Sequence, residues 1–268
     1  MTGSAFLVAV SVVLTRFLSP YLAIAGANSL RIGLGTVPIM IAGIVFGPVY
    51  GGVVGGAADL IGALLFPSGA YTPGFTLSAI LQGVLPYLVV RLFSGRPKAR
   101  LALTSFLLFS LVAVNISFLI GHDSYKFSPD LILKFTNVGK IFFILGLSLV
   151  FSSLLVVFYF IGKSVRPRNS AAKLKIEDIL LFALVNETVV NVFISSIWKM
   201  LYFKLSYVAM TFSASILLLV DVPIKALVIF SILVPLAKVY PEWAVSSRKV
   251  GIFKEFKARA RLVPEREN

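Results

Sequence analysis

The chain has 268 residues, of which 58% are hydrophobic and 13% are charged, and its mean hydropathy is +0.96. A water-soluble globule needs a polar surface, and this composition leaves too few polar residues to provide one. The composition therefore predicts a membrane protein. The sequence has no cysteine, which excludes disulfides and thiolate catalysis, and one histidine, His122, cannot supply a zinc cluster.

The net charge of +14 is the second global feature. Such a charge in a soluble protein would indicate nucleic acid. In a membrane protein it is explained by anchoring to anionic lipid on the cytoplasmic side, so we expect a lipid bilayer and no nucleic acid as the partner of these charges.

Apolar segments separated by proline, glycine and charged clusters predict about eight membrane-spanning helices, and hence an all-α polytopic membrane protein. The second and third predicted helices are short for a bilayer about 30 Å thick, and the last is long enough to tilt or bend at Pro223. In chain order the helices are expected at residues 3–19, 32–47, 49–66, 75–92, 101–121, 138–162, 177–201 and 207–238.

The distribution of Lys and Arg predicts the sidedness of these helices. Threading eight spans alternately gathers seventeen of the 25 basic residues on one side, in the segments 91–100 and 163–175 and in the tail from Lys238. Segments 20–30 and 67–74, on the opposite side, contain none. By the positive-inside rule both termini are cytoplasmic and the loop after the third span faces outward.

The second and third spans carry a glycine repeat. Small residues every four positions allow helix backbones to approach closely. We therefore expect the two spans to pack through a glycine seam made of Gly43, Gly47, Gly51 and Gly55, with Gly52 and Gly56 beside them.

Three ionisable residues, Arg16, Arg31 and Asp59, lie toward the outward ends of the first three spans. Ionisable groups inside a membrane are costly unless they are paired or functional. Two interpretations stay open, and they are compatible. Asp59 pairs with Arg31 or Arg16, or these residues contact a ligand.

Residues 66–78 read FPSGAYTPGFTLS, an uncharged loop rich in glycine, proline and aromatic residues. Proline fixes the backbone angle φ, glycine permits angles that other residues avoid, and aromatic rings offer flat faces to a planar ligand. The pattern indicates a shaped lid over an outward-facing site. The candidate lid residues are Pro67, Ser68, Gly69, Tyr71, Pro73, Gly74 and Phe75.

The seventh and eighth spans also contain polar residues. Asn186, Glu187 and Asn191 fall on or near one helix face close to mid-membrane, where they form either the base of a pocket or an interhelical hydrogen-bond clamp. Asp221 and Lys225 are four residues apart and are expected to neutralise each other. Trp198 and Tyr202 are expected to anchor the outward interface.

The run GIVFGPVYGGVVGGAADLIGALLFPSGAY, from Gly43 to Tyr71, resembles the folate-specific substrate-binding (S) components of energy-coupling factor (ECF) vitamin transporters. The resemblance covers Leu7 to about Val90 and, more loosely, Ile176 to Leu236. It implies a six-helix core, to which this chain adds an apparent inserted helix pair. The expected divisions are residues 1–96, with the lid at 67–75, the inserted pair 97–170, the core helices 171–238 and a basic cytoplasmic tail 239–268.

This resemblance implies capture of folate or a reduced folate outside a prokaryotic cell. Delivery would use a coupling transmembrane subunit and two ATPase subunits, with Ala5 and Ala9 marking the docking surface. Adjacent N–H donors of a pterin suit a carboxylate such as Asp59, and an arginine could meet the glutamate tail. The resemblance thus implies a binding subunit and no enzyme, and neither a cofactor nor a metal is expected.

The chain departs from the family pattern at Ser195 and Ser196, where Asn-Thr is usual, and at Ala214 and Leu217, where basic residues are expected. These departures keep open an S component for a different vitamin. A secondary transporter or a membrane enzyme would need a pathway of ion-coupling carboxylates or a catalytic constellation, and the sequence shows neither. It also has no P-loop, so ATP would have to be hydrolysed by partners.

Overall fold

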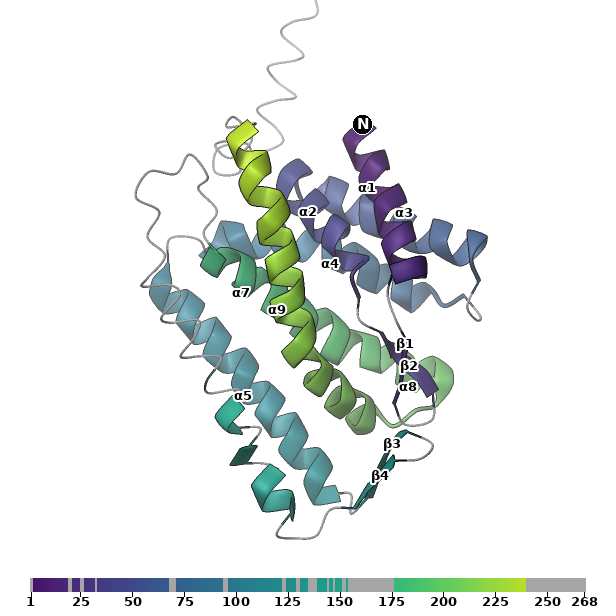
Figure 1. Cartoon of the computed structure of the whole chain (residues 1–268), viewed down its shortest axis with the longest axis vertical. Coiled ribbons are helices and arrows are strands. Elements are labelled where there is room, and N and C mark those ends of the chain that lie inside the picture. The colour runs from purple at the N-terminus through teal and green to yellow at the C-terminus, as the bar shows by residue number, and fades with distance from the viewer. Residues whose placement is uncertain are drawn as a thin grey trace, which may run out of the picture.

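Figure 1 shows a computed structural model of the chain. The structure describes residues 2–18, 21–24, 27–31, 33–67, 71–93, 96–121, 124–128, 131–134, 139–143, 145–146, 148–150, 153 and 176–239. The predicted lid residues Ser68 and Gly69, most of the sixth predicted span and the basic tail lie outside these residues.

The described chain is dominated by apolar helices. Five of them, Pro48–Leu65, Pro73–Phe93, Pro97–Gly121, Asp178–Phe203 and Tyr207–Leu233, are long and apolar enough to cross a membrane, and shorter apolar helices accompany them. The prediction of an all-α polytopic membrane protein is thereby confirmed. The helices are α1 (Thr2–Val13), α2 (Thr36–Phe46), α3 (Pro48–Leu65), α4 (Pro73–Phe93), α5 (Pro97–Gly121), α7 (Ile176–Asn186), α8 (Ser195–Phe203) and α9 (Tyr207–Val239).

Two of the predicted spans contain π-helical segments, which the sequence pattern did not reveal. The first span runs through α1 into the π-helix η1 (Leu14–Leu18), and the seventh joins α7 to α8 through the π-helix η2 (Glu187–Ile194). A π-helical turn inserts an extra residue into the helix and changes which side chains face a neighbour, and such turns are frequent at functional sites.

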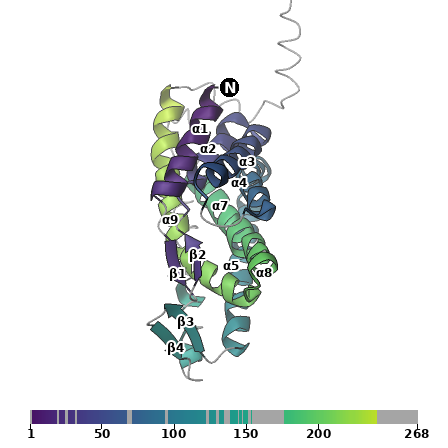
Figure 2. The ribbon, with the colours of Figure 1, turned by 90° about the vertical axis from the view of Figure 1, so that its right-hand side faces the viewer.

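Two short β-hairpins, which the sequence analysis did not predict, lie in connections between helices of the described chain. Strands β1 (Tyr21–Ile24) and β2 (Ala27–Arg31) pair antiparallel between the first two spans, as do β3 (Ser124–Ser128) and β4 (Leu131–Lys134) after α5. The hairpins lie beside each other at one end of the molecule (Figures 1 and 2). The N-terminal end of α1 and the C-terminal end of α9 lie at the opposite end, so these two ends share a side.

The predicted glycine seam joins α2, α3 and α4. A methyl group added to Gly43 or Gly51 would overlap the Gly83 backbone, and one added to Gly83 would overlap the Gly51 backbone. These three glycines thus allow direct contact between helix backbones, as predicted for α2 and α3. Gly47 is an exception, because its φ of 94° forms the corner between the two helices and no atom lies within 4 Å of its added methyl group.

Helix α5 is packed into the core against α9. Phe118 of α5 stacks on Phe212 of α9 with ring centroids 4.1 Å apart, and Asn115 and Ser215 exchange hydrogen bonds of 2.9 and 3.1 Å. These paired polar groups let α5 cross α9 without an unsatisfied amide. The division that treats residues 97–170 as an insertion stays a prediction.

Candidate functional site

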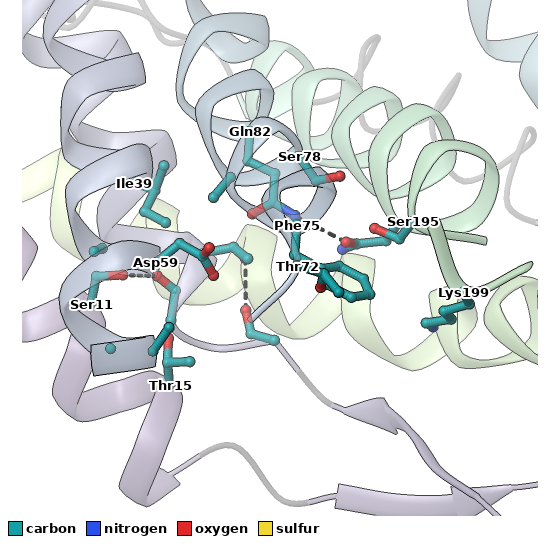
Figure 3. A pocket seen from close by; sticks show the side chains of 18 of the residues that line it. Ser11, Thr15, Ile39, Asp59, Thr72, Phe75, Ser78, Gln82, Ser195 and Lys199 are labelled. Atoms are coloured by element: carbon teal, nitrogen blue, oxygen red, sulfur yellow. Dashed lines mark hydrogen bonds between the residues drawn. The ribbon is translucent and has the colours of Figure 1, made fainter. Parts of the chain in front are cut away.

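A cavity of about 680 Å³ lies among α1, η1, α2, α3, α4, η2, α8 and α9 (Figure 3). It is lined on one side by residues of α3 and η1, and on another by residues of α4 and α8. A cavity of this size is typical of a site for a small organic molecule.

One wall is organised around Asp59 of α3. Thr76 of α4 donates a hydrogen bond of 2.6 Å to Asp59 Oδ2, and the hydroxyl oxygen of Tyr71 lies 2.8 Å from Thr76 Oγ1. Thr76 has a single hydroxyl proton, which Asp59 accepts, so Tyr71 is the donor in the second bond. The segment before α4 is thus tied to the Asp59 carboxylate.

The pairing of Asp59 with an arginine is not seen among the described side chains, where Thr76 is its partner. Arg16 lines the cavity from η1, and its Nε would lie 3.2 Å from a methyl group added to Gly62 of α3. Gly62 lies one helical turn after Asp59 in α3. Because it has no side chain, it leaves room there for the Arg16 guanidinium. Arg31 belongs to β2, where the structure describes the backbone alone.

The floor of the cavity is a chain of hydrogen bonds across three elements. Gln82 Nε2 of α4 donates to Asn191 Oδ1 at 2.9 Å, and Asn191 Nδ2 donates to Glu187 Oε2 at 2.6 Å. Lys225 of α9 then donates both to Glu187 Oε1 and, at 3.2 Å, to Asp221 Oδ2. Two carboxylates therefore share one buried ammonium.

The polar residues of the seventh span were expected to form either the base of a pocket or an interhelical clamp, and these hydrogen bonds are compatible with both. Glu187 and Asn191 line the cavity and also form the predicted interhelical clamp. Asn186 is buried beside the cavity without lining it, and its side-chain amide donates to the Gln82 carbonyl at 3.2 Å. Because Lys225 also binds Glu187, its predicted pairing with Asp221 is confirmed but is only half of the arrangement.

The candidate lid residues separate into two groups. Pro67, Tyr71 and Phe75 line the cavity. Pro73 and Gly74 were expected in the loop before the fourth span, but with Phe75 they form the first turn of α4, because proline suits the first position of a helix. Pro73 and Gly74 are not among the lining residues.

Trp198 explains why Gly74 is a glycine. A methyl group on Gly74 would overlap the Trp198 indole, and Trp198 Nε1 donates to Ser78 Oγ at 3.1 Å. Trp198 therefore joins α8 to α4, and its expected anchoring at the outward interface stays a prediction. Tyr202 of α8 remains half exposed, with its ring centroid 6.3 Å from that of Trp198.

Sequence reasoning missed several residues of this site. Ser78 and Gln82 line the cavity from the same face of α4 as the predicted residue Phe75, and Ser195 and Lys199 line it from one face of α8. Spacings of three, four and seven residues within the predicted spans were the available signal. Ser195, Ala214 and Leu217, where the chain departs from the family pattern, all line the cavity, whereas Ser196 is buried outside it.

Comparison with known proteins gives the class of this chain. A family described as "ECF-type riboflavin transporter, S component" matches residues 1–143, which is just over half of the chain. The chain therefore belongs to this family of ECF transporter S components.

A particular relative points to another vitamin. Over 85 residues the chain is 44% identical to the folate transporter FolT of Clostridium novyi (strain NT). The aligned segment covers 32% of this chain and 46% of the relative, so the chain spans about half the length of the curated relative that it matches. The family and the relative thus agree on vitamin uptake across a membrane and differ in the vitamin named.

Proposed function

We propose that this S component captures folate, or a reduced folate, and delivers it to an ATP-driven ECF complex. The observation that carries the choice of folate is the 44% identity to FolT. The chemistry of the cavity supports the same choice.

A folate molecule has three parts that the cavity could recognise. The pterin presents adjacent N–H donors, which suit a carboxylate acceptor such as Asp59 or the line formed by Gln82, Asn191 and Glu187. The aromatic rings of the ligand would lie against Phe75 or Tyr71. The glutamate tail is an anion and requires a cation.

The lid residues and the arginines keep the roles predicted for them. Tyr71 and Pro67 would close over the bound ligand from the segment between α3 and α4. Arg16 would hold charge near Asp59 and attract an anionic ligand toward the cavity. Arg31, Ser68 and Gly69 remain candidates on sequence grounds.

Riboflavin is the second candidate, because the matching family is described by that vitamin. Its ring system would also fit against Phe75, and its hydroxyl groups could meet the serines and threonines of the cavity. Riboflavin has no acidic group, so it would supply no counter-ion for the Lys199 ammonium, which lines the cavity and has no ion-pair partner among the described residues. We therefore favour folate.

Transport requires partners, since the sequence has no P-loop. We infer that a coupling transmembrane subunit docks on the face of α1 that carries Ala5 and Ala9, both of which are exposed. Two ATPase subunits would complete the complex. The host membrane would be a prokaryotic cell membrane with both termini cytoplasmic, as the distribution of basic residues predicts.

Uptake of labelled folate tests this proposal. Cells that lack folate uptake would receive this chain together with a coupling subunit and two ATPase subunits. We expect accumulation of folate that excess riboflavin does not inhibit and that an inactive ATPase variant abolishes. Accumulation of riboflavin in place of folate would contradict the substrate, and accumulation with the inactive ATPase would contradict the energy source.

A further inference from the structure

Lys199 is a cation that lines the cavity and takes no part in the hydrogen-bond chain of its floor. It lies in α8 and lines the cavity together with Ser195 and Phe203, which are one helical turn before and after it. Among the described residues, no hydrogen bond or ion pair engages the Lys199 ammonium. Figure 3 shows its side chain extending from α8 into the pocket.

The acidic groups that line the cavity are already engaged. Asp59 accepts the hydroxyl proton of Thr76, and Glu187 and Asp221 share the ammonium of Lys225. None of these carboxylates is paired with Lys199. An ammonium held in a membrane-embedded cavity is costly without an anion, so a counter-ion is expected to come from outside the protein.

The placement of Lys199 relative to Asp59 indicates where that anion belongs. In Figure 3 the two residues stand on opposite sides of the pocket, with Phe75 between them. Arg16 lies on the Asp59 side, over Gly62. A ligand whose ring system lies on Phe75 can therefore reach Asp59 with one end and Lys199 with the other.

We propose that Lys199 binds the acidic end of the ligand. The ligand would lie across Phe75 with its hydrogen-bond donors at Asp59 and its carboxylates at Lys199. This inference rests on the proposed function and refines it, because it moves the anion site from the arginines to α8. It also gives a physical basis for selecting a vitamin that carries an acidic group over one that does not.

A competing interpretation places the Lys199 ammonium at lipid headgroups. Lysines near helix ends extend their stems along apolar surface and reach the interface, and the neighbouring residues Leu201, Tyr202 and Phe203 are exposed. In that case Lys199 would contribute nothing to binding. The two interpretations differ in how a change at Lys199 affects charged and uncharged ligands.

The experiment compares two ligands on four chains purified in detergent. The ligands are folate and its dimethyl ester, which keeps the ring system but masks both carboxylates. The chains are the wild type, Lys199→Met, Lys199→Arg and the matched control Lys204→Met, which changes an exposed lysine just after α8. Calorimetry gives the eight dissociation constants, and Lys199→Gln replaces Lys199→Met if that variant does not fold.

We expect Lys199→Met to weaken folate binding by roughly tenfold to a hundredfold, as for loss of a charge-assisted hydrogen bond, and to leave ester binding unchanged. Lys199→Arg should retain most of the affinity, and Lys204→Met should match the wild type. If Lys199→Met loses affinity equally for folate and the ester, or loses none, while the wild type binds folate, the role of Lys199 is contradicted and the proposed function stands. Failure of the wild type to bind folate would overturn the proposed function as well.

Discussion

Lys225 of α9 donates a hydrogen bond to Glu187 of η2 with both side chains buried, at 0% and 3% exposure. The same ammonium also donates a hydrogen bond to Asp221, one turn away on α9, with 3.2 Å between Lys225 Nζ and Asp221 Oδ2. The ion pair links the seventh and last spans under the cavity and leaves Glu187 on its floor. The position of the floor therefore depends on a charge that is removed from water.

Removal of the Lys225 ammonium should destabilise the fold. Lys225→Met leaves two buried carboxylates without a counter-ion, and breaking a buried pair in this way costs about 3–5 kcal/mol. We expect a lower midpoint of thermal unfolding in detergent.

A charge-balanced variant provides the control for this loss. Combining Lys225→Met with Glu187→Gln and Asp221→Asn removes the charges together, so most of the stability should return. An unfolding midpoint for Lys225→Met equal to that of the wild type would show that the ammonium is dispensable.

The contact between Gly51 and Gly83 allows α3 and α4 to meet backbone to backbone. Gly83→Ala should separate the two helices and destabilise the protein by about 1–3 kcal/mol, because the added methyl group overlaps the Gly51 carbonyl. Gly121→Ala is the matched control, since no atom lies within 4 Å of the methyl group added there. Equal unfolding midpoints for the two variants would contradict a tight seam.

Thr76 positions Asp59 without lining the cavity itself. Thr76→Val keeps the shape of the side chain but removes the hydroxyl that joins Asp59 to Tyr71. We expect folate affinity to fall roughly tenfold, as for loss of about 1.5 kcal/mol of hydrogen bonding to a charged group.

Thr104→Val is the matched control for Thr76→Val, because Thr104 is also buried but donates to the Arg100 carbonyl away from the cavity. Calorimetric titration should give it the affinity of the wild type. The same loss of affinity in both variants would mean that general destabilisation, and not the Asp59 network, sets affinity.

The exposed alanines of α1 allow a test of assembly separate from binding. Ala5→Trp combined with Ala9→Trp places two large rings on the proposed docking face, so co-purification of the coupling subunit should be lost while folate binding persists. Ala102→Trp changes an exposed alanine of α5 and serves as the control. Normal assembly of the double variant would move the docking surface elsewhere.

Most of the helical architecture could be predicted from the sequence, because long apolar segments leave little choice inside a bilayer. Apart from the sixth, the predicted spans end within four residues of the helix ends that the structure describes. The two hairpins were missed, since short polar connections carry no such constraint. The lid was drawn too long, because Pro73 starts α4 instead of ending a loop.

The site was predicted only in part. Asp59, Glu187 and Asn191 were recognisable because ionisable and amide groups stand out in apolar segments. Thr76 and Gln82 were missed because a lone threonine or glutamine is unremarkable until a neighbouring helix supplies its partner. Glu187 also pairs with Lys225. The four-residue spacing that revealed the Asp221–Lys225 pair could not reveal this contact, because Glu187 lies on another span.

Calorimetric titration of the purified, detergent-solubilised chain with folate decides whether folate is the substrate of this S component. Riboflavin and thiamine are the controls. We expect saturable binding of folate and no heat of binding with the other two vitamins. Saturable binding of riboflavin, or a folded chain that is silent toward folate, would contradict the proposed substrate.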